Sequence, residues 1–190
     1  MVAGALLLLT VAGAVLAAGP PFPDRPTGAH VIDDAEVFNR APEDGVEEGL
    51  RAFLDSTGVD IVVLTQVKAA ARDQAAADDD ARALLEQWDV GGADGQGAVL
   101  LWDFDRRTTR AQVSLALGGG LASDVDADAL RTQLDSAMAK SLEGDDWLNA
   151  LNSGLFTITA AVPGGAIVTP VPSVAPAVPA AENATTKTPR

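Results

Sequence analysis

The chain has 190 residues, of which 47% are hydrophobic, so it is long enough to bury the core of one domain. Its 27 acidic and 13 basic side chains give a net charge of -14 at pH 7, which argues against nucleic acid as a partner. The absence of cysteine excludes disulfides, thiolate metal ligands and cysteine nucleophiles.

The N-terminus predicts export. Residues 2–18 are apolar except for Thr10, and a proline-rich stretch follows at once. This run has the length of a signal-peptide core and is just short of a comfortable membrane span. No Lys or Arg precedes it, although signal peptides ordinarily begin with positive charge. We assign residues 1–29 to a signal or anchor segment with a Pro-rich spacer, and expect an exported protein that is either secreted or membrane-anchored.

The remainder divides into a domain at 30–162 and a tail at 163–190. The tail is rich in Pro, Ala, Val and Thr without periodicity, which predicts a disordered stalk or linker. The elements predicted in the domain are, in chain order, an initial strand at 30–35, a helix from Pro42 to Gly58, a strand at 59–65, a helix at 75–88, strands at 98–103 and 111–117, a helix after Asp124 and a last helix from about Asp145 to Ile158.

The pattern of these elements predicts the fold class. Residues 59–65 are β-branched and nearly all apolar, which is typical of a central strand buried on both faces. A short connection between the strands at 98–103 and 111–117 favours a hairpin. The order predicts an α/β fold in which a small central sheet is flanked by helices. The acidic run Asp78–Asp80 is interpreted as a solvated helix face.

An ordered set of short motifs extends over this domain. They are Val31-Ile32-Asp33-Asp34-Ala35, Thr57-Gly58-Val59-Asp60-Ile61-Val62-Val63-Leu64, Trp88-Asp89-Val90-Gly91, Gly97-Ala98-Val99-Leu100-Leu101, Asp105-Arg106, and Gly118-Gly119-Gly120 before Ser123-Asp124. In this order they resemble the TPM domain over about residues 30–160. At the glycine turn the chain departs from the family pattern Gly-Tyr-Gly-Leu-Glu: it has no tyrosine, and Ala116 and Gly119 fall near the Tyr and Glu positions.

The resemblance implies a three-layer α/β sandwich. TPM domains occur in thylakoid lumen proteins involved in photosystem II repair and in bacterial proteins that are exported or tethered to membranes. Some members have been associated with divalent-cation binding and some with acid phosphatase activity. The resemblance therefore implies a function outside the cytoplasm, with a membrane or a membrane protein as partner.

Three carboxylates at motif positions are candidate metal ligands: Asp34, Asp105 and Asp124. Asp34 precedes a segment that leads into a helix, Asp105 lies in the strand connection, and Asp124 follows the glycines. Hard oxygen ligands in loops suit Ca²⁺ or Mg²⁺. If these ends converge, they form an open oxygen site. The competing interpretation of Asp124 is a helix N-cap, with Asp126 and Asp128 favourable in the first turn because of the helix dipole.

Arg106 and Gly119 are candidate anion-binding positions. Arg106 carries a guanidinium in the strand connection, and Gly119 lies in a triple glycine whose backbone N–H groups could face an anion. The alternatives are a local charge pair at the connection and a tight turn. No motif indicates nucleophilic catalysis, and the sole histidine, His30, lies at the edge of the spacer.

The sequence therefore predicts an exported TPM-like domain that binds a divalent cation through acidic loops and acts as an interaction or assembly module at a membrane face. Two alternatives stay open. One is a metal-dependent acid phosphatase that hydrolyses phosphomonoesters with the cation polarising the phosphoryl oxygen. The other is a purely structural domain carried on a Pro-rich stalk.

Overall fold

The computed structural model describes residues 20–38, 40–68, 73–105 and 110–165. Their contacts divide them into two compact units. We call residues 20–37 and 59–123 the sheet unit, and residues 38–58 and 124–165 the helical unit. Residues 1–19, Arg106 and residues 166–190 lie outside the described residues.

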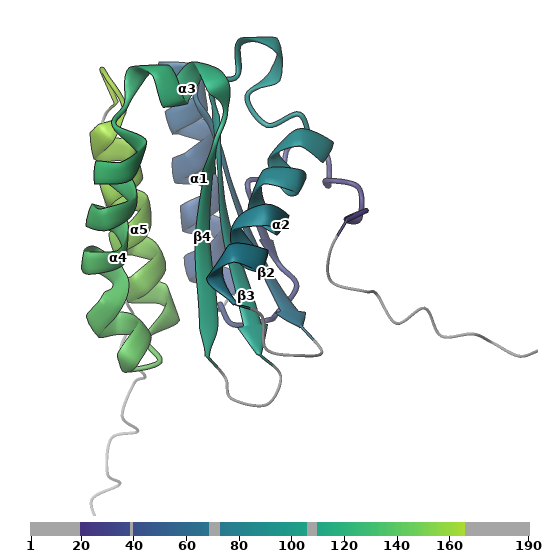
Figure 1. The fold of residues 1–190 in the computed structure, drawn as a ribbon, viewed down its shortest axis with the longest axis vertical. Helices are drawn as coiled ribbons and strands as arrows, with labels where there is room; N and C mark the ends of the chain where they lie inside the picture. The colour runs from purple at the N-terminus through teal and green to yellow at the C-terminus, as the bar shows by residue number, and fades with distance from the viewer. Residues whose placement is uncertain (1–19, 39, 69–72, 106–109, 166–190) are drawn as a thin grey trace, which may run out of the picture. The chain divides into compact units, whose positions relative to one another are not determined.

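The sheet unit contains a four-stranded mixed sheet in the order β1-β2-β3-β4 (Figure 1). The first three strands are parallel, and β4 pairs antiparallel with β3, with Phe104 beside Ala111. The predicted hairpin is therefore confirmed. The strands are β1 (Val31–Asp33), β2 (Asp60–Lys68), β3 (Gly97–Asp105) and β4 (Ala111–Leu117).

Helix α2 (Gln74–Gln87) packs over β3 and β4 (Figure 1). The helix approaches the sheet closely because its inner face carries small side chains such as Ala77 and Ala81, which are fully buried. Its N-cap is Asp73, whose side chain accepts from the Ala76 N–H at 2.9 Å. The resulting core consists of Phe22, Val62, Leu64, Ala81, Leu84, Val90, Val99, Leu101 and Ala116.

The alternate residues of β2 and β3, which point to the other face of the sheet, are buried as well. Ile61, Val63 and Leu100 have no exposed surface, and the same is true of Trp102, which stacks on Phe104 with ring centroids 6.3 Å apart. Burial on both faces explains why these strands are nearly continuous apolar runs in the sequence.

The helical unit contains α1 (Arg40–Thr57), α4 (Ala127–Glu143) and α5 (Trp147–Ala161). Helices α4 and α5 pack against each other, and a Cβ at Gly154 would lie 2.9 Å from the Met138 sulfur. The absence of a side chain at Gly154 therefore allows α4 and α5 to approach each other closely. No helix within the described ranges is long and apolar enough to span a bilayer.

The predicted α/β class and the order of its strands and longer helices are confirmed. Two short elements were missed, namely η1 (Gly92–Asp94) and α3 (Gly119–Asp124). The helix expected after Asp124 begins at Ala127, and its N-cap is Asp126, which accepts from the Ala129 N–H at 3.0 Å. Asp124 instead ends α3, and Asp128 lies in the first turn of α4 as expected.

Candidate functional site

The carboxyl ends of the parallel strands form one edge of the sheet, where sites on α/β sheets are usually found. Strand β1 ends at Asp33, β2 at Lys68 and β3 at Asp105. Two of the three predicted metal ligands, Asp34 and Asp105, therefore lie at this edge. We call it the carboxyl edge.

The turn after β1 is held by hydrogen bonds to β2. Thr65 of β2 accepts from the Asp34 N–H through its carbonyl and from the Ala35 N–H through its hydroxyl oxygen, both at 3.1 Å. Its hydroxyl also donates to the Asp33 carboxylate. The same Asp33 oxygen accepts from the Val37 N–H at 3.2 Å. Asp33 is thus built into the turn, whereas Asp34 is an exposed residue beside it.

The pKa of the Asp34 carboxyl is raised above its ordinary value. The first cause is partial burial of the carboxyl group, although the residue as a whole is exposed, and the second is the negative charge of Asp33. Both causes disfavour the ionised form of Asp34. A cation bound beside Asp34 would favour the ionised form and so act against both effects.

The raised pKa predicts that Asp34→Asn stabilises the protein at neutral pH in the presence of a chelator, by no more than about 0.5 kcal/mol because the site is exposed. Ionised Asp34 is disfavoured in the folded state, so the gain is present above the folded-state pKa. It disappears as the pH falls through that value towards 3.8, where the wild-type carboxyl takes up its proton.

Urea unfolding measured across this pH range checks the prediction. Asp24→Asn is the control, because Asp24 is exposed in the same unit and its replacement removes the same formal charge. A loss of stability at pH 7 in Asp34→Asn would show that the carboxylate makes a favourable contact, contrary to the prediction.

Asp105 lies across β2 from the β1 turn. It pairs with Lys68 in the β2–β3 register, and its N–H donates to the Arg110 carbonyl at 2.9 Å. Asp33 pairs with Thr65, three residues before Lys68, so two strand spacings and three residues separate it from Asp105. The straight-line distance between the two backbone positions is therefore about 14 Å. The structure places Asp34 and Asp105 at one edge without packing them together.

Asp124 is in the helical unit. Within the part of the chain that the structure describes, no group of three or more His, Asp or Glu residues is arranged to hold one metal ion. The metal-ligand assignment of Asp34, Asp105 and Asp124 thus stays a prediction.

The glycine turn lies at the opposite end of the sheet, because β4 is antiparallel to β3. The Gly118 N–H donates to the Gly97 carbonyl at 2.8 Å, and the Leu121 N–H donates to the Gly95 carbonyl at 3.1 Å. A Cβ at Gly118 would lie 2.3 Å from the Gly95 oxygen, and one at Gly120 would lie 2.1 Å from the Asp94 oxygen. Two glycine-rich segments therefore pack backbone against backbone.

Gly119 differs from its two neighbours, because a Cβ there would meet nothing within 4 Å. It is the first residue of α3, which has six residues. Close packing explains why positions 118 and 120 require glycine, but it does not explain the glycine at position 119. The anion-binding role of Gly119 and Arg106 stays a prediction, and Arg106 lies outside the described residues.

A buried polar cluster lies under α2. The Lys68 ammonium donates to an Asp80 carboxylate oxygen at 2.8 Å and lies 3.8 Å from the Asp103 carboxylate. The Gln66 amide donates to the same Asp103 oxygen at 2.6 Å. Lys68, Asp80 and Asp103 are each at most 3% exposed. The interpretation of Asp78–Asp80 as a solvated face is wrong for Asp80, because this residue points from α2 toward the sheet and binds Lys68.

The strand periodicity carries a signal for this cluster. Gln66 and Lys68 continue the alternation of the buried residues Val62 and Leu64, so side chains at these positions point into the core face under α2. Polar residues at core positions of a strand predict partners nearby, although not which ones.

A second polar contact joins the start of α2 to β4. The Ser114 hydroxyl donates to Asp78 at 2.6 Å, and the Gln74 amide donates to the Ser114 oxygen and to the Val113 carbonyl, both at 2.9 Å. A serine beside a carboxylate is a possible nucleophile and base. Ser114 is only 2% exposed, so it holds α2 to the sheet and is not presented to a substrate.

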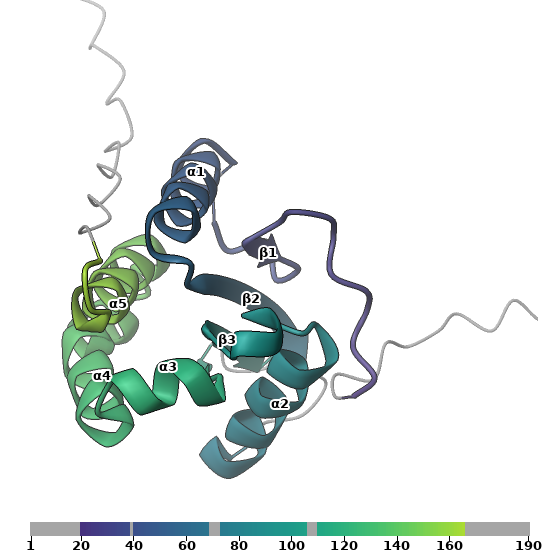
Figure 2. The ribbon, with the colours of Figure 1, turned by 90° about the horizontal axis from the view of Figure 1, so that it is seen from above.

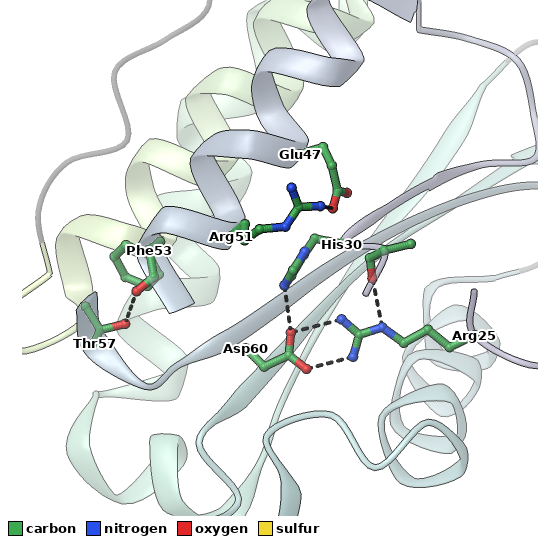
Figure 3. A network of polar contacts seen from close by, with 8 residues as sticks. Arg25, His30, Glu47, Arg51, Phe53, Thr57 and Asp60 are labelled. Atoms are coloured by element: carbon green, nitrogen blue, oxygen red, sulfur yellow. Dashed lines mark hydrogen bonds and ion pairs between the residues drawn. The ribbon is translucent and has the colours of Figure 1, made fainter. Parts of the chain in front are cut away.

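His30 is part of a network at the start of β2 (Figure 3). The Arg25 guanidinium binds both oxygens of the Asp60 carboxylate, at 2.7 and 3.1 Å, and donates to the Ala29 carbonyl. The His30 Nε2 atom lies 3.6 Å from Asp60, and His30 is 3% exposed. The sole histidine is therefore a buried structural residue rather than a group on a flexible spacer.

Comparison with known proteins identifies the family. Residues 31–161 match the family model described as the TPM domain, which covers more than half of the 190 residues, so the chain belongs to the TPM domain family. No curated protein sequence matches it. The fold is similar to a solution NMR structure of the N-terminal domain of a protein from P. gingivalis, with a TM-score of 0.56 at 20% sequence identity, over 73% of this chain and 87% of that one.

Proposed function

We propose that this TPM domain is an exported module that binds a divalent cation at the carboxyl edge and mediates an interaction or assembly at the face of a membrane. The match to the TPM family covers residues 31–161, which include all the strands and helices of the described structure. The apolar run at 2–18 supports export or anchoring, and the net charge of -14 favours cations over anions as ligands.

The observation that carries the cation proposal is the position of Asp34, which lies beside a second carboxylate at the carboxyl edge of the sheet. Its carboxyl lies next to Asp33 at the end of β1, and burial and the neighbouring charge both raise its pKa. A hard divalent cation with oxygen ligands would stabilise the ionised form at this place. Asp105, at the end of β3, adds a second negative charge to the same edge, about 14 Å from Asp33.

Calcium titration by calorimetry tests the proposal. We expect the full chain to bind Ca²⁺ weakly, with a dissociation constant of about 10⁻⁴ to 10⁻³ M, as is common for extracellular modules. Asp34→Asn combined with Asp105→Asn should weaken binding at least about tenfold, which corresponds to about 1.4 kcal/mol. Asp124→Asn is measured alone, because Asp124 is in the other unit.

Asp24→Asn combined with Asp89→Asn is the matched control, since it removes two exposed negative charges away from the carboxyl edge. An equal loss of affinity in this control would indicate a diffuse electrostatic effect rather than a site. Absence of heat with Ca²⁺, Mg²⁺ and Mn²⁺, or unchanged binding in the double variant, would contradict the proposal and leave the structural-domain alternative.

The competing proposal is metal-assisted hydrolysis of phosphomonoesters. It requires a general acid or a metal-bound water beside a substrate. The chain has no Cys or Tyr, and its one histidine is 3% exposed. A carboxyl group such as that of Asp34 would have to supply the acid, and it is exposed rather than enclosed in a site. We expect no cation-dependent turnover of p-nitrophenyl phosphate between acid and neutral pH. Turnover that is lost in Asp34→Asn with Asp105→Asn would favour the hydrolase instead.

A further inference from the structure

Thr65 is a buried polar residue of β2 that lies beside the end of β1. It pairs with Asp33 in the register of these two parallel strands, and β1 is the edge strand of the sheet next to β2 (Figure 2). Ile61 and Val63, which share its face of β2, are apolar, and all three residues have no exposed surface. Valine has the same branched shape as threonine and suits a buried strand, so the hydroxyl at this position is explained by its partners rather than by packing.

Thr65 contacts the turn that follows β1 through both its side chain and its backbone. The hydroxyl donates to the Asp33 carboxylate and accepts from the Ala35 N–H at 3.1 Å. The Thr65 carbonyl accepts from the Asp34 N–H, also at 3.1 Å. The Asp33 oxygen that binds the hydroxyl is held a second time, by the Val37 N–H at 3.2 Å. One buried residue therefore holds both acidic residues of the turn.

Two features of this turn act against its folded shape. Glu36 has a φ of 53°, in the left-handed region, which costs energy for a residue other than glycine and persists only where surrounding contacts hold it. The negative charges of Asp33 and Asp34 are adjacent in sequence and repel each other. The contacts from Thr65 oppose both effects, because they tie the turn to a strand in the middle of the sheet unit.

We propose that Thr65 is a positioning residue for the cation site at the carboxyl edge, where its hydroxyl holds Asp33 and the backbone of the turn so that the Asp34 carboxylate lies beside a fixed second negative charge. The inference rests on the proposed function, in which Asp34 binds the cation. Thr65 is not itself a ligand, since it has no exposed surface. A turn that is ordered before binding loses less conformational freedom when the cation binds, so its affinity is higher.

Two pairs of side chains separate the hydroxyl from the packing around it. Thr65→Val keeps the branched shape and removes both hydroxyl contacts, while the backbone contact with Asp34 stays. Thr65→Ser and Thr65→Ala both remove the methyl group, and they differ from each other only in the hydroxyl. A purely structural role of Thr65 would lower stability in all three variants without separating their cation affinities. A positioning role predicts that, in each pair, the member without the hydroxyl binds more weakly.

Calcium titration of the full chain by calorimetry measures the effect. We expect the dissociation constant to rise at least about fivefold in Thr65→Val, and by the same factor from Thr65→Ser to Thr65→Ala, which is the net value of one hydrogen bond. Thr65→Ser itself should bind within about twofold of the wild type, because its hydroxyl can make the same contacts. The Ser and Ala pair decides the question if Thr65→Val does not fold.

Thr159→Val is the matched control, since it makes the same substitution at a threonine of α5 that also has no exposed surface. The Thr159 hydroxyl donates to the Leu155 carbonyl at 2.8 Å within the helical unit. Its loss should leave the calcium affinity unchanged. An equal loss of affinity in Thr159→Val and Thr65→Val would show that affinity follows overall stability, and would overturn the positioning role.

Failure of the inference is distinguishable from failure of the proposed function. A wild-type chain that binds no Ca²⁺ would contradict the proposed function, and the inference with it. A wild-type chain that binds Ca²⁺, with equal affinities within each pair of variants, would overturn the role of the Thr65 hydroxyl and leave the cation site standing.

Discussion

Replacing Lys68 by Met should lower the free energy of unfolding by about 3–5 kcal/mol, because it leaves buried carboxylates without their cation. Lys68 lies 2.8 Å from Asp80 and 3.8 Å from Asp103, and these side chains are at most 5% exposed. Methionine fills a similar volume, so the loss reports charge rather than packing. Urea unfolding followed by tryptophan fluorescence measures it.

The matched control lies on α2, the helix that carries Asp80. Arg82 forms an ion pair with Asp79 at 2.6 Å, but both side chains are more than 60% exposed. Arg82→Met should therefore change stability by no more than about 0.5 kcal/mol. Adding Asp80→Leu to Lys68→Met should recover part of the loss, since it removes one stranded charge. A loss below about 1 kcal/mol in Lys68→Met would show that water reaches the cluster.

Gly120→Ala should destabilise the protein by about 2–3 kcal/mol, because its Cβ would lie 2.1 Å from the Asp94 carbonyl oxygen and the backbone must move. Gly119→Ala is the control one residue away. A Cβ at Gly119 meets nothing within 4 Å, so we expect no loss there. The same urea measurement compares the two variants, and equal effects would refute the close packing of the two glycine segments.

The fold was largely predictable from local patterns. The apolar run of β2 and the short connection between β3 and β4 carry strong strand and hairpin signals. The six-residue helix α3 was missed because it is too short to show a helical period. The packing of Phe22 was missed because its partners, such as Gln87, are 65 residues away in sequence. The burial of Asp80 was missed for the same reason, since its partner Lys68 lies on β2.

The candidate site was predictable in part. Asp34 follows β1 and Asp105 is the last residue of β3, and parallel strands end at the same edge of a sheet. The glycine turn follows β4, and the antiparallel direction of β4 puts this turn at the other end of the sheet. A sequence pattern shows where a strand ends but not in which direction the strand runs in the sheet. It therefore could not show whether the glycine turn lies at the same end of the sheet as Asp34 and Asp105.

The most direct test of the proposed function is a calcium titration followed by ¹⁵N NMR of the full chain. We predict that the largest shifts of amide resonances occur at residues 33–36, with smaller ones at Asp105. Shifts confined to exposed acids of α2 such as Asp79, or no shifts at millimolar Ca²⁺, would contradict a cation site at the carboxyl edge.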